Sequence, residues 1–351
     1  MNISGYEKLA EALNNLPNGF PPDEERNDIR ILEYLFNEVE AETASNLLAT
    51  YETAKEIAAR IEADYGETRK TLKALAKRGL IKAGKSEGGL GYALMPFVVG
   101  FYEEQVNTID KEFAQIFEDY YKSVSHELFR LEPQFHRVIP INESIEIDME
   151  IHPHESLMTF IDEAQAWGVQ DCICRKQKEL IDDGCDHPME VCMVFYSKPN
   201  VFDSHPYIKP LTKDEAKATL QLAARSGLVP TVSNRQDGRS YICNCCSCSC
   251  GILRGIQEFG ISNVVSKSPF LCSVDEDLCG GCEICVEECQ FEAIDLATGF
   301  ASIIAEKCVG CGLCVVSCPD EAMSMIRRNP EEQPFIPDSS QQWKELRMEN
   351  K

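Results

Sequence analysis

The sequence lacks several patterns that define common classes of protein. Its longest uncharged stretch, residues 88–102, is shorter than the ~20 residues that a membrane-spanning helix needs. Residues 1–15 have neither the basic nor the apolar region of a signal peptide. Neither the G-x-G-x-x-G motif of dinucleotide-binding proteins nor a P-loop is present. We therefore expect a cytoplasmic protein that has no membrane span and no nucleotide-binding motif.

Positive charge is scarce as well. Among the 351 residues, 34 are Lys or Arg and 58 are Asp or Glu, which gives a formal net charge of −24. Such an acidic surface disfavours binding to nucleic acid or anionic membranes and favours a basic or matched protein partner. The apolar fraction of 44% is ordinary for a folded protein, and the length predicts two or three domains.

Cysteine is absent from the first part of the chain, although the whole chain has 18 cysteines. All of them lie between Cys172 and Cys318. Disulfides are rare in the reducing cytoplasm, where clustered cysteines more often bind metal. The distribution therefore predicts metal centres in the second half of the chain.

The charge distribution, the positions of proline and glycine, and the spacing of apolar residues indicate an α+β multidomain protein. We predict an N-terminal lead (1–26), a winged helix-like domain (27–100), a connector made of a long helix and a strand (101–151), a cysteine-rich metal-binding domain (152–270), a domain with two cysteine repeats (271–328) and a tail (329–351). The tail has the composition of an extended linker followed by a short polar segment, which is either solvated or docks onto another protein chain.

Residues 27–100 show a compact helical pattern that ends in a hairpin. Apolar residues recur at helical spacing in 27–40, and Thr53-x-x-Glu56 is a capping box that begins a second helix. A third helix covers 67–78 and ends before Gly79. Two short strands follow. Three helices and a hairpin resemble the winged helix-turn-helix family over residues 27–94.

The third helix and the hairpin carry the clearest basic patch of the chain. Its members are Arg69, Lys70, Lys73, Lys77, Arg78, Lys82 and Lys85. A helix that reads the major groove of DNA needs such a patch for phosphate contacts. Winged helices also serve as protein-docking modules, and the acidity of the rest of the chain favours that alternative.

The connector is predicted to contain two elements. Residues 100–132 have the periodicity of one long amphipathic helix, whose apolar stripe packs within the chain or, alternatively, against a second copy in a homodimer. Apolar and acidic residues then alternate between Ile145 and Ile151, which predicts a half-buried strand within 137–151.

Nine cysteines lie in residues 152–270, in two groups separated by a predicted helix at 213–226. They are Cys172, Cys174, Cys185, Cys192, Cys243, Cys245, Cys246, Cys248 and Cys250. Thiolates packed this densely repel one another unless a cation neutralises them, so we expect that a subset of them binds metal. Their Cys-x-Cys and Cys-Cys steps are tighter than a zinc knuckle and favour at least one iron–sulfur cluster, with zinc as the alternative.

This segment loosely resembles uncharacterised multidomain iron–sulfur proteins that have a Cys-x-Cys-Arg element followed by a dense Cys-Asn-Cys-Cys element. That resemblance implies no particular reaction. His187 and His205 lie near these cysteines in the sequence. We interpret both as surface or capping residues, with metal ligation as the alternative.

The C-terminal part contains a duplicated cysteine motif. Cys279-x-x-Cys282-x-x-Cys285-x-x-x-Cys289 recurs 29 residues later as Cys308-x-x-Cys311-x-x-Cys314-x-x-x-Cys318. Three thiolates on one tight loop can hold three irons of a cubane, and the fourth, predicted to begin a short helix, reaches the other cluster. Cys272 lies outside the pattern and is interpreted as a small buried residue.

Over residues 271–328 this motif resembles the bacterial ferredoxin with two [4Fe–4S] clusters. The resemblance implies one cluster on Cys279, Cys282, Cys285 and Cys318, and a second on Cys308, Cys311, Cys314 and Cys289. Gln290 departs from the family, which has proline there as it has at Pro319, and we expect a looser turn but no lost ligand. Eleven acidic residues against three basic ones between 271 and 328 predict low reduction potentials.

Two clusters of one type store and relay single electrons. We therefore predict a protein that relays low-potential electrons as a component or partner of a larger oxidoreductase, rather than a stand-alone enzyme. Its cofactors would be two [4Fe–4S] clusters and at least one further iron–sulfur cluster. A redox-sensing transcription regulator that binds DNA through the winged helix is the alternative. A third hypothesis places catalysis at an exposed cluster of the middle domain.

Overall fold

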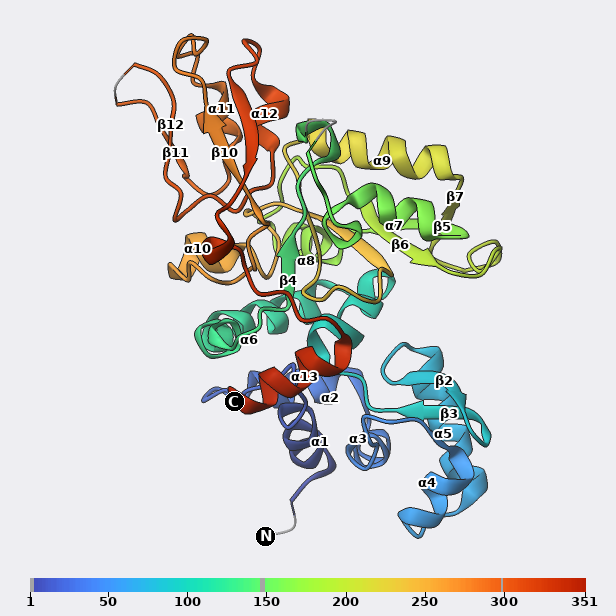
Figure 1. Ribbon diagram of the computed structural model, residues 1–351. Helices are drawn as coiled ribbons and strands as arrows, with labels where there is room; N and C mark the ends of the chain where they lie inside the picture. The colour runs from blue at the N-terminus through green and yellow to red at the C-terminus, as the bar shows by residue number, and fades with distance from the viewer. Residues whose placement is uncertain (1–2, 146–148, 298) are drawn as a thin grey trace. The chain divides into compact units, whose positions relative to one another are not determined.

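The computed structural model describes residues 3–145, 149–297 and 299–351. The chain forms two compact units (Figure 1). Unit 1 comprises Met1–Leu128, Gln177–Asp183 and Arg347–Lys351, and unit 2 comprises Phe129–Lys176 and Gly184–Leu346. Among the described residues, no helix is both long enough and apolar enough to span a lipid bilayer.

Unit 1 is mainly helical. Its helices are α1 (Gly5–Asn14), α2 (Asn27–Leu35), α3 (Glu38–Ser45), α4 (Ala54–Arg60), α5 (Tyr65–Lys77) and most of α6 (Lys111–Arg130), with short turns at Phe97–Phe101 and Glu103–Asn107. Its strands β1 (Glu52–Thr53), β2 (Lys82–Ser86) and β3 (Gly89–Ala93) form an antiparallel sheet in the order β1-β3-β2. The third helix and the hairpin lie where the sequence predicted them, and the winged-helix assignment stays a prediction.

Capping side chains explain where the helices of unit 1 begin. Thr53 and Glu56 form the predicted capping box at the start of α4. Asn37 forms another capping box at the start of α3, so the single helix predicted over 27–40 is two helices. Ser4 caps α1, a helix in the lead segment that the sequence pattern did not reveal.

The helix predicted over 100–132 is shorter than expected. α6 begins at Lys111, and Asp110 accepts a hydrogen bond from the backbone nitrogen of Phe113 at 2.9 Å, which satisfies an otherwise free amide at the helix start. The apolar stripe is covered within unit 1, where the ring of Tyr102 stacks on that of Phe117 with centroids 3.9 Å apart. Packing within one chain therefore accounts for the stripe without a second copy.

Unit 2 is built around a six-stranded antiparallel sheet in the order β4-β8-β9-β6-β5-β7. The strands are β4 (His136–Val138), β5 (Ala166–Asp171), β6 (Glu190–Tyr196), β7 (Lys209–Leu211), β8 (Val229–Ser233) and β9 (Tyr241–Cys245). The accompanying helices are α7 (Leu157–Glu163), the first turn of α8 (Ile173–Leu180), α9 (Lys213–Arg225) and α10 (Arg254–Phe259), with 3-10 turns at Asn142–Ser144 and Pro153–Glu155. Phe160 of α7 and Ala216 of α9 share a core with Met193 of β6.

The strand predicted within 137–151 differs from the structure. β4 ends at Val138, and residues 146–148 of the predicted strand lie outside the described residues. Ile145, Met149 and Ile151 nevertheless pack against the core of the C-terminal domain. The described residues on the apolar side of the predicted alternation are thus partly buried, although β4 lies nearer the start of the predicted range.

The C-terminal domain contains two small antiparallel pairs of strands and two short helices. Its elements are β10 (Phe270–Val274), α11 (Ile284–Glu288), β11 (Ile294–Asp295), β12 (Ser302–Ile303), α12 (Leu313–Ser317) and β13 (Met323–Arg327). β10 pairs with β13, and β11 with β12. A 3-10 turn (Pro330–Glu332) and α13 (Ser340–Glu349) follow. The polar tail is therefore helical, and Trp343 Nε1 donates a hydrogen bond to the carbonyl of Gln134 at 2.9 Å.

Candidate metal centres

The two cysteine repeats of the C-terminal domain fold into two similar halves. In each half, a loop with three cysteines leads into a short helix, α11 or α12. Gly281 and Gly310 have φ angles of 67° and 71°, a left-handed conformation that glycine adopts without strain. Cys289 and Cys318 are the C-caps of these helices. The fourth cysteine of each repeat therefore ends a helix, whereas the sequence predicted that it begins one.

Eight cysteines of this domain line two cavities. The first cavity is lined by Cys279, Cys282, Cys285 and Cys318. The second is lined by Cys289, Cys308, Cys311 and Cys314, together with Cys272. Each cavity combines three cysteines of one repeat with the fourth cysteine of the other. This is the division that the ferredoxin resemblance implies.

The surroundings of these thiols suit a bound cation. The backbone nitrogen of Ala301 lies 3.4 Å from Cys279 Sγ, and that of Ala293 lies 3.4 Å from Cys289 Sγ. Burial raises the pKa of Cys285 to about 11, so its thiolate needs a compensating positive charge. Four thiols around one cavity are the donor set of a [4Fe–4S] cluster, and the residues present fit that group.

Cys272 is a ninth cysteine in this domain. It is 3% exposed, as expected of a small buried residue. Its sulfur also lies 3.5 Å from Cys314 Sγ, which places it against a candidate ligand of the second cavity. A thiol in this position is able to hydrogen-bond to a cluster-bound sulfur.

Six of the nine cysteines in the middle domain form a closed ring in which each thiol shifts the pKa of its two neighbours, called here the six-thiol ring. Going round the ring, the interacting pairs are Cys172–Cys174, Cys174–Cys250, Cys250–Cys245, Cys245–Cys243, Cys243–Cys192 and Cys192–Cys172. Cys172, Cys245 and Cys250 are buried. The two sequence groups of cysteines therefore meet, as a shared metal requires.

The sheet brings the members of the six-thiol ring together. Cys172 and Cys174 follow the end of β5, while Cys192 lies in β6, the neighbour of β5. Cys243 and Cys245 lie in β9, on the other side of β6, and share one face because side chains alternate along a strand. Antiparallel pairing of three neighbouring strands thus converts distant sequence positions into one ring.

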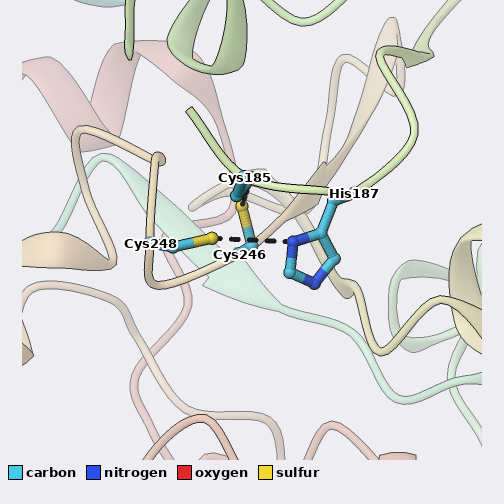
Figure 2. A group of neighbouring side chains, drawn as sticks. All are labelled: Cys185, His187, Cys246 and Cys248. Atoms are coloured by element: carbon cyan, nitrogen blue, oxygen red, sulfur yellow. Dashed lines mark hydrogen bonds between the residues drawn. The ribbon is translucent and has the colours of Figure 1, made fainter. Parts of the chain in front are cut away.

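The remaining three cysteines of the middle domain meet a histidine. Cys185, His187, Cys246 and Cys248 form a group, called here the Cys₃His group, whose four ligand atoms all lie within 4.8 Å of one another. Cys185 Sγ is 3.9 Å from Cys246 Sγ, and Cys248 Sγ is 3.6 Å from His187 Nδ1 (Figure 2). His187, interpreted from the sequence as a surface or capping residue, is therefore a candidate ligand. His205 lies outside this group.

A buried arginine lies between the two groups of thiols. Arg175 is 2% exposed and donates hydrogen bonds to the carbonyls of Asn244, at 2.7 Å, and Pro188, at 3.0 Å. A hydrogen bond from Cys248, together with the charge of Arg175, lowers the pKa of Cys246 to about 5. The positive charge therefore helps to hold anionic sulfur in this region.

Gln290 connects the C-terminal domain to the dense cysteine loop. Its Oε1 accepts a hydrogen bond from the backbone nitrogen of Ser247 at 2.6 Å, and its Nε2 donates to the carbonyl of Gly227. Gln290 directly follows Cys289, which lines the second cavity. The residue that departs from the ferredoxin pattern therefore joins two cysteine-rich parts of unit 2.

Comparison with known proteins identifies the C-terminal part. Residues 273–295 and 301–324 match the family model of the 4Fe-4S binding domain. This part of the chain is a ferredoxin-type 4Fe-4S domain with two repeats. The chain is also 43% identical over 43 residues to one subunit of the "H(2):CoB-CoM heterodisulfide,ferredoxin reductase" of Methanothermobacter marburgensis. That match covers 12% of this chain and 6% of the relative, and no solved structure matches the chain.

The sequence interpretation undervalued two residues, His187 in the middle domain and Gln290 within the ferredoxin-type domain. For His187 the available signal was its spacing, because Cys185-x-His187 and Cys246-x-Cys248 are ligand pairs of the same form. For Gln290 the departure from proline was noticed, but its partner Ser247 is 43 positions away. Such a contact depends on tertiary structure and leaves no local pattern.

Proposed function

We propose that this protein is an iron–sulfur electron-transfer component that relays low-potential electrons between a redox partner and its middle domain through the ferredoxin domain. The observation that carries the proposal is the pair of cavities, each lined by four cysteines drawn from both repeats. When bound there, [4Fe–4S] clusters supply reversible storage of single electrons.

The cysteines have distinct roles in this proposal. Cys279, Cys282, Cys285 and Cys318 hold one cluster, and Cys308, Cys311, Cys314 and Cys289 hold the other. The six-thiol ring holds a further iron–sulfur cluster, because its six sulfurs exceed the four that one [4Fe–4S] cluster needs. Zinc in the ring is the alternative that metal analysis excludes or establishes.

The bridge made by Gln290 supports a relay between the two parts of unit 2. Gln290 follows Cys289, and its hydrogen-bond partner Ser247 is the residue between Cys246 and Cys248. A few covalent bonds and one hydrogen bond therefore join a ligand of the second cavity to the dense cysteine loop. This contact holds the two candidate redox sites in a fixed relation, which a relay requires.

The first cavity offers an approach for a redox partner. Cys282 is exposed, and the neighbouring apolar side chains of Leu278 and Ile284 are 55% and 38% exposed. An exposed ligand beside apolar side chains suits a transient protein contact. The segment shared with a component of a reductase supports a place in, or beside, an oxidoreductase complex.

Metal analysis together with redox titration tests this proposal. The full chain, purified without oxygen, is analysed for iron and acid-labile sulfide and then titrated by electron paramagnetic resonance. We expect more than the roughly eight irons that two [4Fe–4S] clusters contain. Chemically reduced protein should pass electrons to a one-electron acceptor in a reaction that depends on the clusters.

Two variants separate the parts of the proposal. Cys285→Ala should remove iron from the ferredoxin domain and slow electron delivery, whereas Cys192→Ala should remove only the iron in excess of about eight. Wild-type protein with iron in the ferredoxin domain that cannot be reduced and reoxidised contradicts electron transfer. Wild-type protein with only about eight irons contradicts the cluster in the six-thiol ring.

A second candidate function is supported by the exposed basic face of α5. Arg69, Lys70, Lys73 and Lys77 are all exposed on this helix. Arg78 is not available in the same way, because its guanidinium lies 2.9 Å from the carboxylate of Glu40. The remaining cations form a compact surface for phosphate contacts, as a redox-sensing regulator that binds DNA would need.

Gel-shift measurements at several salt concentrations decide between these functions. A DNA-binding regulator should select one sequence from a random pool, with affinity that changes on cluster oxidation. Lys70→Glu combined with Lys73→Glu should abolish that binding, while Lys55→Glu, an exposed change on α4, should not. Absence of sequence-specific binding at low salt in wild type excludes the regulator and leaves electron transfer.

A further inference from the structure

The geometry of the Cys₃His group points to a separate site for one zinc ion, a site distinct from every iron–sulfur position proposed above. We infer that Cys185, His187, Cys246 and Cys248 bind Zn²⁺ as four ligands of a closed tetrahedron. This inference goes beyond electron transfer, since zinc has no redox chemistry and four protein ligands leave no open coordination position. The ion is structural.

The spacing of the ligand atoms fits a single ion. Zinc binds sulfur at about 2.3 Å and imidazole nitrogen at about 2.0–2.1 Å, so tetrahedral ligands stand about 3.8 Å apart. The observed separations are 3.9 Å between Cys185 and Cys246 sulfurs and 3.6 Å between Cys248 Sγ and His187 Nδ1. Every pair in the group lies within 4.8 Å. One ion at the centre therefore requires little movement of the side chains.

The ferredoxin domain provides an internal comparison for a cluster. Its eight candidate ligands line two cavities, and among the described residues neither set of four converges within 4.8 Å, as expected where each thiolate of a cubane binds a different iron. In the part of the chain that the structure describes, the Cys₃His group is the set of potential ligands that converges within 4.8 Å. Convergence on a point distinguishes this group from the cluster sites.

The sheet explains why the Cys₃His group is separate from the six-thiol ring. β6 and β9 are antiparallel neighbours, so the loop before β6 lies beside the loop after β9. Cys185 and His187 are in the first loop, and Cys246 and Cys248 are in the second. Because successive side chains point to opposite faces at the end of β9, Cys245 belongs to the six-thiol ring and its neighbour Cys246 belongs to the Cys₃His group.

The proposed ion would fasten the two loops that border the six-thiol ring. Cys246 is buried, whereas Cys248 is exposed, so an ion can reach the group from solvent. The four candidate ligands lie outside helices and strands, and four metal–ligand bonds would compensate for the entropy of ordering the two loops. The ion would thus hold Cys245 and Cys250 in position for the neighbouring ring.

X-ray absorption at the zinc edge, combined with zinc and iron analysis of one sample, tests the inference. The full chain is purified without oxygen and dialysed against a chelator. We expect one zinc per chain, with three sulfurs at about 2.3 Å and one nitrogen at about 2.0–2.1 Å. His187→Ala should reduce retained zinc at least tenfold. His187→Cys should retain zinc, with four sulfurs bound to the ion.

Controls make each outcome decisive. His205→Ala removes an exposed histidine outside the group and should retain zinc, and Cys192→Ala should lose iron and retain zinc. Loss of iron without loss of zinc in His187→Ala, or wild-type zinc without a nitrogen ligand, overturns the inference. Because iron and the resonance signals of the ferredoxin domain are measured on the same samples, failure here is distinguishable from failure of the electron-transfer proposal.

Discussion

Gln290 Oε1 accepts a hydrogen bond from the backbone nitrogen of Ser247 across 2.6 Å. Ser247 is flanked by two members of the Cys₃His group, and Gln290 follows Cys289 of the second ferredoxin cavity. Proline at position 290 has no side chain that could make this bond. The exception to the ferredoxin pattern is therefore a specific connection between two candidate metal centres.

Gln290→Ala should weaken this connection without removing a ligand. Loss of two hydrogen bonds, to Ser247 and Gly227, should lower the free energy of unfolding by about 1–3 kcal/mol. Iron content should be unchanged, and electron exchange between the ferredoxin domain and the six-thiol ring should slow. Denaturant unfolding and rapid-mixing reduction measure the two effects. Gln221→Ala, an exposed change on α9, is the matched control, and equal rates in the two variants contradict the predicted role.

The division of ligands between the cavities predicts an unusual pattern of iron loss. Cys289 and Cys308 line the same cavity although they come from different repeats. Cys289→Ala together with Cys308→Ala should therefore remove about four irons, the content of one cluster. Cys289→Ala together with Cys285→Ala should remove about eight. Iron analysis of the two double variants distinguishes this arrangement from one in which each repeat binds its own cluster, where the results exchange.

Cys272 should tune the cluster of the second cavity. Once Cys314 is a metal-bound thiolate it can only accept a hydrogen bond, so the Cys272 thiol, 3.5 Å away, becomes the donor. A hydrogen bond to a ligand sulfur favours the reduced state, and Cys272→Ala should lower the reduction potential by tens of millivolts, the equivalent of about 1 kcal/mol. Cys272→Ser keeps a donor and should restore most of the shift in a redox titration. Equal potentials in wild type and Cys272→Ala contradict the role.

His136 predicts a dependence of stability on pH. Burial lowers its pKa to about 4, and its ring nitrogens contact the hydroxyls of Tyr241, at 2.9 Å, and Thr231, at 3.3 Å. Because the folded pKa lies below the unfolded value of about 6.5, the contribution to stability is complete above that pH and declines as pH falls towards 4. The expected loss between pH 7 and 5.5 is about 1 kcal/mol. His136→Gln should remove this part of the slope in denaturant midpoints, and an unchanged slope contradicts the assignment.

The ferredoxin-type domain could be predicted because its cysteines follow one another closely in the sequence. The duplicated motif from Cys279 to Cys318 identified a ferredoxin-type domain, because loop length alone constrains which thiols converge. The capping box of Thr53 and Glu56 is an equally local sequence pattern, and Thr53 marks the start of α4 as predicted. In contrast, α1 was missed because Leu9 and Leu13 are its main buried positions, too few to define a period.

The middle domain shows what local patterns cannot specify. The sequence predicted that a subset of the nine cysteines binds metal, but their division into groups of six and three depends on the register between β6 and β9. That register is set by the whole sheet, which includes Met193 and Ile242 in its core. The predicted start of the long helix at residue 100 was wrong for a related reason, because the apolar periodicity continues through the turns that precede Lys111.

The peptide bond between Cys245 and Cys246 has a consequence for how the protein matures. One of these residues belongs to the six-thiol ring and the other to the Cys₃His group. If both sites bind metal as proposed, an ion in one site orders the backbone on which the other depends, so filling the first lowers the entropic cost of filling the second. Insertion of the two metals into the middle domain would then be cooperative.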